Sequence, residues 1–282
     1  MHETICFGGL FYFYTMLDAD KSIGIFDSGL GGLSVWKYVA EFLPRESFIY
    51  FGDSKHAPYG NKSDAFITER CHHITRFLLD ENVKLIIVAC NTATAAAIES
   101  LRENYPHIQF VGMEPAIKPA SLLSKTGHIG VLATHGTFKG ELFKRNQEKY
   151  QPYVKIHYTE GNGLVELAEQ GKVYSDEAEK LLRKYIEPLV ENRVDQLVLG
   201  CTHYSLFIPV IEKITKGAIH ILHPADAIAK RTKDLLMQHR ILQTRKNHGE
   251  NAFYSNGKTS NMLDVINQLD VEAEPNIFSV DN

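Results

Sequence analysis

Two cysteines of this 282-residue chain occupy equivalent positions in the sequence, and a thiol can carry a proton or act as a nucleophile. Cys90 follows the apolar run 85–89, and Cys201 follows the apolar run 197–200. A short apolar run closed by small polar residues is typical of a buried parallel strand. Side chains just beyond the carboxyl end of such a strand lie where α/β proteins bind ligands. The pattern therefore predicts chemistry on a small molecule that uses both thiols.

The neighbours of the two thiols are suited to hold a charged small molecule. Neutral donors and acceptors are supplied by Asn91, Thr92, Thr202 and by the residues Thr134 and Thr137 of another predicted turn. Such groups bind charges without competing as acid or base. A free thiol, with a pKa of about 8.5, is mostly protonated at neutral pH, so proton relays are needed. His203 and Asp27 could serve as relays, or could instead be a loop histidine and a helix N-cap.

Other matches in the sequence indicate that the two cysteines belong to two similar halves. The sequence 23–25 (IGI) resembles 129–131 (IGV), and 114–116 (EPA) resembles 223–225 (HPA). With the cysteines, these pairs keep the same order at offsets of 106 to 111 residues. About 110 residues is a typical domain size, so we expect two similar α/β units. The alternative is two similar units that share no site.

The predicted elements place these residues at turns. Strands are expected at 21–26, 47–52, 83–89, 109–112, 128–133, 155–158, 196–200 and 219–222, with a further one near Phe253. Helices are expected at 33–43, 63–82, 92–104, 164–170, 175–191, 225–238 and near Leu263. One more helix is expected to follow the turn 134–137 and to run through about residue 150. Alternating strands and helices predict parallel sheets with right-handed crossovers. The fold class is therefore α/β, and the tail after residue 225 could pack back on the first half.

Three other kinds of chemistry fit the sequence less well. The turn 27–32 (DSGLGG) lacks the third glycine of a dinucleotide fingerprint, although the acidic Asp53 follows the second predicted strand. The glycines could instead bring backbone N–H groups and the Ser28 hydroxyl near a carboxylate. No metal site is expected, because the histidines are dispersed and residues 71–73 (CHH) point to different faces of a helix. A redox function is disfavoured because no C-x-x-C pair occurs.

Composition fits a globular protein of the cytoplasm. Hydrophobic residues make up 44% of the chain, and four widely spaced cysteines do not form a secreted disulfide framework. The net charge of −4 and scattered Lys and Arg residues give no reason to expect nucleic acid or a membrane as partner. Residues 5–17 are uncharged, aromatic-rich and too few to span a bilayer. We expect them to belong to an upstream extension or to precede a true start at Met16.

The motifs taken together resemble the glutamate racemases of the cofactor-independent aspartate/glutamate racemase superfamily. The matching stretches are IGIFDSGLGGLSV (23–35), FGDSKHAPYG (51–60), VACNTATA (88–95), EPA (114–116), VLATHGT (131–137) and LGCTHY (199–204). They span about residues 22–230, in the order that the family shows. One departure is Ser205, where the family usually has proline. The segment before residue 21 and the tail beyond about residue 239 are less similar.

The resemblance implies a two-base racemisation of glutamate without a cofactor. One cysteine would remove the α-proton and the other would deliver a proton to the opposite face. By resemblance, Cys90 acts on D-glutamate and Cys201 on L-glutamate, assisted by Asp27, His203 and Glu169. The substrate-binding residues implied are Asp27, Ser28, Tyr59, Gly60, Asn91, Thr92, Thr134, Thr137, Thr202 and His203.

The resemblance also implies the organisation and the partners of the protein. We expect two pseudo-symmetric, doubly wound parallel-sheet domains with the active site in the cleft between them. The first domain would comprise residues 21–116 and 225–282, the second residues 117–224, with residues 1–20 as an extension. A homodimer in the cytoplasm would supply D-glutamate for peptidoglycan synthesis. A racemase for aspartate is the nearest alternative, and some family members inhibit DNA gyrase, so an additional binding role is open.

Overall fold

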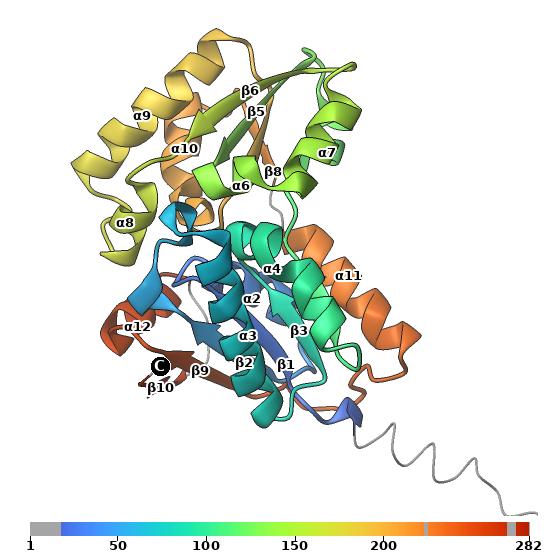
Figure 1. Cartoon of the computed structure of the whole chain (residues 1–282). Coiled ribbons are helices and arrows are strands. Elements are labelled where there is room, and N and C mark those ends of the chain that lie inside the picture. The colour runs from blue at the N-terminus through green and yellow to red at the C-terminus, as the bar shows by residue number, and fades with distance from the viewer. Residues whose placement is uncertain (1–17, 223–224, 270–274, 282) are drawn as a thin grey trace, which may run out of the picture.

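Two separate parallel β-sheets organise the chain (Figure 1). The computed structural model describes residues 18–222, 225–269 and 275–281, so the predictions for residues 5–17 lie outside the described residues. The first sheet has the order β10-β9-β2-β1-β3-β4 and the second the order β6-β5-β7-β8. Every strand pair within these described residues is parallel. The predicted α/β class with parallel sheets is confirmed.

The strands were largely anticipated by their apolar runs. Those of the first sheet are β1 (Ile23–Asp27), β2 (Phe48–Gly52), β3 (Leu85–Val88), β4 (Gln109–Gly112), β9 (Asn251–Ser255) and β10 (Asn276–Ser279). Those of the second are β5 (His128–Ala133), β6 (Lys155–Glu160), β7 (Gln196–Gly200) and β8 (His220–Leu222). The order β2-β1-β3-β4 repeats as β6-β5-β7-β8, so the internal sequence matches correspond to a repeated topology. The cysteines Cys90 and Cys201 follow the equivalent strands β3 and β7.

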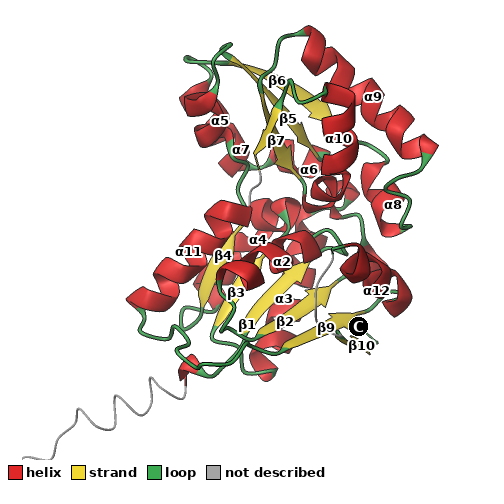
Figure 2. Ribbon diagram, turned by 180° about the vertical axis from the view of Figure 1, so that it is seen from behind, coloured by secondary structure: helices red, strands yellow, loops and turns green. Residues whose placement is uncertain are grey.

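Helices cover both faces of each sheet, as the two views show (Figures 1 and 2). In the first half they are α2 (Leu33–Phe42), α3 (Asp64–Asp80), α4 (Asn91–Asn104), α11 (Ala225–Gln238) and α12 (Thr259–Gln268). In the second they are α5 (Ile117–Leu123), α6 (His135–Lys139), α7 (Glu141–Tyr150), α8 (Leu164–Glu169), α9 (Asp176–Glu191) and α10 (Ile208–Thr215). Short 3₁₀ turns are η1 (Ser54–His56), η2 (Tyr59–Asn61) and η3 (Thr202–Phe207). The structure adds α5, α10 and β10 to the predicted elements and makes residues 135–139 a short helix rather than a turn.

Alternation along the strands divides the first half into two cores. Ile23 and Ile25 of β1 face α2, α11 and α12, whereas Phe26 faces α3 and α4. Successive side chains of a strand point to opposite faces, and burying each large aliphatic side chain contributes about 1.5–3 kcal/mol. The tail returns to the first sheet because β9 pairs with β2 in parallel. No helix in the described ranges is long and apolar enough to span a bilayer.

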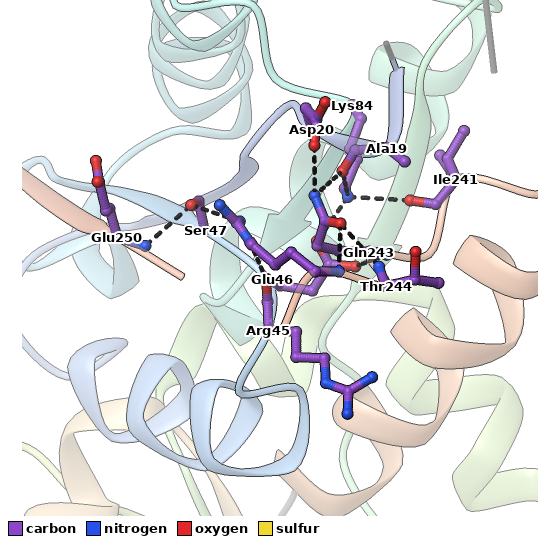
Figure 3. Close-up of polar contacts among 11 residues, drawn as sticks. Ala19, Asp20, Arg45, Glu46, Ser47, Lys84, Ile241, Gln243, Thr244 and Glu250 are labelled. Carbon is purple, nitrogen blue, oxygen red and sulfur yellow. Dashed lines mark hydrogen bonds and ion pairs between the residues drawn. The ribbon is translucent and has the colours of Figure 1, made fainter. Parts of the chain in front are cut away.

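A buried ion pair at the amino end of the first sheet contacts several segments that are far apart in the sequence (Figure 3). Lys84 Nζ lies 2.6 Å from Glu46 Oε2, and both side chains are 1% exposed. The same ammonium donates to the carbonyls of Ala19 and Ile241, while Gln243 N donates to Glu46 Oε1. A buried charge pair is tolerated when such hydrogen bonds satisfy it. The network therefore links the segment between α11 and β9 to the first sheet.

Candidate active site

Both cysteines line one cavity between the carboxyl edges of the two sheets. The cavity is lined by Ser28, Pro58, Tyr59, Gly60, Cys90, Asn91, Thr92, Thr134, Val165, Cys201, Thr202 and His203. Ten of these twelve residues were predicted from the sequence as site residues. The other three predicted ones, Asp27, Thr137 and Glu169, lie behind the lining and contact it. Pro58 and Val165 were not predicted, because neither has a polar group that marks it in the sequence.

The thiol of Cys90 lies at the start of a helix. The residue is the N-cap of α4, and its Sγ accepts from Ala93 N at 3.4 Å. The Ser28 hydroxyl is 3.6 Å from the same sulfur. Burial, reinforced by the charge of Asp27, raises the pKa of the Cys90 thiol to about 12, although the Ala93 and Ser28 contacts act against this rise. Cys90 is therefore a protonated thiol at neutral pH.

The thiol of Cys201 lies beside a histidine that a glutamate holds in place. Sγ of Cys201 is 3.9 Å from Nδ1 of His203, and Nε2 of His203 is 2.6 Å from Oε1 of Glu169. Burial would lower the pKa of His203, but its bonds to Cys201 and Glu169 and the charge of Asp27 raise it well above the ordinary value. The imidazole can therefore pass a proton between the sulfur and the rest of the site.

Glu169 joins the two halves of the molecule. Its Oε1 also accepts from the backbone N–H of Leu30 at 2.7 Å, in the glycine-rich turn after β1. A Cβ on Gly29 would lie 2.1 Å from that oxygen, and a Cβ on Gly31 would lie 2.4 Å from His203 N. Gly31 is thus required where the His203 backbone of the second half approaches the turn, and Gly29 leaves room for the Glu169 carboxylate. This use differs from cradling a pyrophosphate.

Asp27 ends β1 and lies next to the second half. Its Oδ2 accepts from Gly29 N at 3.0 Å, and its Oδ1 accepts from the Thr202 hydroxyl at 3.1 Å. Burial raises the pKa of Asp27, and Glu169 adds to this, while the positive His203 acts to lower it. The carboxyl is fully buried, so its charge depends on nearby groups, which also include the backbone N–H of Gly32. The pKa of Asp27 therefore depends on whether His203 is protonated.

Three threonines connect the halves on the other side of the cavity. The hydroxyls of Thr92 and Thr134 are 2.9 Å apart, and those of Thr134 and Thr137 are 3.0 Å apart. The Thr137 hydroxyl donates to the Gly200 carbonyl at 3.1 Å, in the residue before Cys201. A chain of neutral hydroxyls can donate to a carboxylate or accept from an ammonium group. The three residues are therefore brought together as the sequence predicts.

The side chain of Asn91 is available to bind a ligand. It is 3% exposed, and neither its Oδ1 nor its Nδ2 has a hydrogen-bond partner among the described residues. An unsatisfied buried amide costs about 1–3 kcal/mol, so such groups usually have a functional reason. Asn91 lines the cavity beside Cys90, where a bound ligand could supply the missing partners.

Asp53 lies behind Tyr59, which lines the cavity, and accepts several hydrogen bonds there. Asp53 is fully buried and accepts hydrogen bonds from the Tyr59 hydroxyl, from both Nε and Nη2 of Arg70, and from Asn256 and His56. Burial would raise the pKa of Asp53, but Arg70, Tyr59 and His56 lower it. Because its oxygens are engaged in this way, Asp53 is not available for a ribose hydroxyl. Arg70 was missed in the sequence because it lies on α3, far from any predicted turn.

The free space of the cavity is small. It amounts to about 10 Å³, which is roughly the room that one water molecule needs. This space is much smaller than an amino acid, so the lining must move apart for one to bind. Within the described ranges, no three His, Cys, Asp or Glu side chains are grouped so that they could hold a metal ion. The lining does present two thiols, one from each half, and a thiol is a group that can transfer protons.

Comparison with known proteins identifies the family of the chain. The family model described as Asp/Glu/Hydantoin racemase matches residues 34–232. The glutamate racemase of Ectopseudomonas mendocina is 40% identical over 251 residues, which are 89% of this chain and 95% of that protein. The chain belongs to the glutamate racemase family. The family consists of isomerases, so the predicted enzyme class is confirmed.

Solved structures of the family share the fold. A glutamate racemase isoform from Bacillus anthracis superimposes with a TM-score of 0.82 at 29% identity, covering 93% of this chain and 97% of that one. The Escherichia coli enzyme, solved with L-glutamate and the activator UDP-MurNAc-ala, gives a TM-score of 0.80 at 30% identity, covering 92% and 98%. The predicted fold class, two parallel-sheet halves flanked by helices, is therefore that of the family.

Proposed function

We propose that the chain interconverts L- and D-glutamate by proton transfer through Cys90 and Cys201. The observation that carries this proposal is that two buried thiols, one following β3 and one following the equivalent β7, line the same cavity. Racemisation needs a proton removed from one face of the α-carbon and a proton delivered to the other. Two acid–base groups reaching one ligand from opposite sheets meet that need.

The substrate follows from the family and from the lining. The relatives that match over most of this chain are glutamate racemases, and the Escherichia coli structure contains L-glutamate. Asn91, Thr92 and Thr134 offer neutral hydrogen bonds for the charged groups of an amino acid. We assign Ser28, Tyr59, Gly60, Thr137 and Thr202, with Asp27 and His203, to the same binding role.

The two thiols differ in what prepares them for proton transfer. In the proposed scheme Cys201, with His203 and Glu169 behind it, acts on L-glutamate, and Cys90, with Ser28 and Asp27 nearby, acts on D-glutamate. The starting thiol must lose its proton to a neighbour before it can act as a base. The developing carbanion is stabilised by oriented hydrogen bonds in a closed, dry site. No step of the scheme is routed through a cofactor.

The biological setting follows from the same family membership. We propose a cytoplasmic homodimer that supplies D-glutamate for peptidoglycan synthesis. We also propose the division into residues 21–116 with 225–282 and residues 117–224. In support, Ile117 packs with the second sheet and Ala225 with the first. Inhibition of DNA gyrase stays a prediction of the resemblance.

The proposal is tested by incubating the purified, PLP-free protein with L-glutamate in D₂O. We expect the optical rotation to decay to zero while deuterium appears at the α-carbon. Decay with L-aspartate but not with L-glutamate would assign the sister activity instead. No decay with either amino acid would refute racemisation and favour a binding role.

A further inference from the structure

We propose that Asn261 of α12 is a positioning residue that holds Glu169 against His203 from the first half of the molecule. The proposal rests on the proposed racemase function, which it deepens. Asn261 Nδ2 donates to the backbone carbonyl of Glu169 at 3.1 Å. Asn261 lies in the tail of the chain, beyond residues 34–232 that the family model matches. Figures 1 and 2 show α12 next to α8, the helix that Glu169 ends.

The carboxylate of Glu169 is held by short contacts, so its position can change little without breaking them. A single carboxylate oxygen accepts both from Leu30 N at 2.7 Å and from His203 Nε2 at 2.6 Å. The missing Cβ of Gly29 would lie 2.1 Å from that oxygen, so Glu169 already touches the turn. Charge-assisted hydrogen bonds of this length weaken steeply when the geometry changes. A shift of the helix end by a few tenths of an ångström would therefore alter the bond to His203.

The helix that carries Glu169 does not fix its own last residue. α8 has only six residues, and the last carbonyls of a helix lack partners within it. The carbonyls of Leu167 and Ala168 accept from the backbone N–H groups of Lys172 and Gly171. The carbonyl of Glu169 is bound instead by the Asn261 side chain, which comes from a different half of the chain. The end of α8 is thus completed by α12.

The helix α12, which carries Asn261, is packed into the core of the first half. Met262, Val265 and Ile266 of α12 are buried in the core of the first sheet. Asn261 is in the first turn of this helix, next to Met262, so its side chain starts from a fixed backbone. The first half therefore holds Glu169 at two points, by Leu30 N at the carboxylate and by Asn261 at the carbonyl. Residues that hold a catalytic group in place commonly affect rate without touching the substrate.

The test is a double-mutant cycle of Asn261→Ala with Glu169→Gln, with kcat/KM for glutamate and thermal unfolding measured for all four proteins. The matched control is Asn267→Ala, an exposed asparagine on the same helix. We expect Asn261→Ala to lower kcat/KM by about 3- to 10-fold in the native background and by less than about twofold in the Glu169→Gln background. The shift of the unfolding temperature should be equal in both backgrounds, because the Glu169 carbonyl remains. Equal losses of activity in the two backgrounds, or no loss, would overturn the proposal.

A second readout separates this proposal from the proposed function. NMR titration of the His203 imidazole without substrate should give a lower pKa in Asn261→Ala than in the native protein and Asn267→Ala, because the bond to Glu169 favours the charged form. An unchanged titration refutes the positioning role. If the native protein does not racemise glutamate, the proposed function fails, and the titration still decides whether Asn261 positions Glu169.

Discussion

The turns that carry Cys90 and Cys201 have the same place in the two sheets but different chemistry. Each follows the strand beside the first strand of its half, β3 next to β1 and β7 next to β5. Cys90 begins the 14-residue helix α4, whose third backbone N–H donates to the sulfur. Cys201 begins a 3₁₀ turn, and its sulfur lies beside the His203 imidazole. The repeated topology brings two thiols to one cavity, and the local sequence gives each a different proton partner.

The difference extends to the charges around the thiols. Cys90 is near the negative Asp27, which with burial keeps its proton on the sulfur. The pKa of His203, next to Cys201, is raised by its bonds to Cys201 and Glu169 and by the charge of Asp27, which together outweigh the effect of burial. A fold-level symmetry therefore need not give symmetric kinetics.

Removing either thiol should stop the reaction in both directions. We expect Cys90→Ala and Cys201→Ala each to lower kcat by about 10³-fold or more, near the upper range for losing an acid–base group. Cys71→Ala is the matched control, since Cys71 is fully buried but does not line the cavity. Circular dichroism assay of L- and D-glutamate would measure the rates. Turnover close to the native rate in either single variant would contradict the two-thiol scheme.

Changing His203 should expose the asymmetry directly. His203→Gln removes the relay behind Cys201, and we expect kcat to fall by about 10²-fold. Because the two enantiomers are equally stable, kcat/KM must fall equally in both directions, so the asymmetry appears in kcat and KM separately. We expect the larger loss of kcat with L-glutamate, on which Cys201 is proposed to act. Equal losses of kcat for both enantiomers would argue against a role specific to Cys201.

The Cys90 side should respond to Ser28 and to pH. With a thiol pKa of about 12, the rate of Cys90 alkylation should rise about tenfold per pH unit between pH 7 and 10. In Ser28→Ala the loss of a hydrogen bond that favours thiolate should slow alkylation several-fold and lower kcat/KM by about 10-fold. Mass spectrometry after iodoacetamide treatment would follow the modified Cys90 peptide. An alkylation rate that levels off below pH 9 would show that the thiol is less perturbed.

The buried charge of Asp27 should lower the free energy of unfolding as pH rises. Its pKa is higher in the folded than in the unfolded state, so its contribution to stability is full below the unfolded value and is lost as pH rises through the folded one. The variant Asp27→Asn has no carboxyl to ionise at this position, so it does not lose this stability as pH rises. We therefore expect the difference in free energy of unfolding, variant minus native, to increase by about 1 kcal/mol from pH 4 to pH 8. Urea unfolding at the two pH values measures this, and a pH-independent difference would mean that the Asp27 charge costs nothing.

Local patterns were sufficient for most of the fold. The runs before Cys90 and Cys201 are apolar on both faces, which is typical of a buried parallel strand, and they form β3 and β7. Short or weakly amphipathic segments were missed: α5 and α10 are seven and eight residues long, and β10 is an exposed edge strand. Thr134 caps the short helix α6 rather than a simple turn, because its hydroxyl accepts from Thr137 N. These elements are specified by contacts more than by sequence period.

Local sequence was enough to predict the two thiols, the polar residues beside them and the strands that they follow, because each of these depends on neighbours within a few positions. The difference between the thiols depends on contacts between distant parts of the chain. Leu30 reaches Glu169 across 139 residues and Asn261 reaches it across 92, and no local pattern encodes such pairs. The same holds for the Lys84 network that returns the tail to the first sheet. Hydrogen bonds and charges act over a few ångströms in space, so only the folded chain establishes which proton partner each cysteine receives.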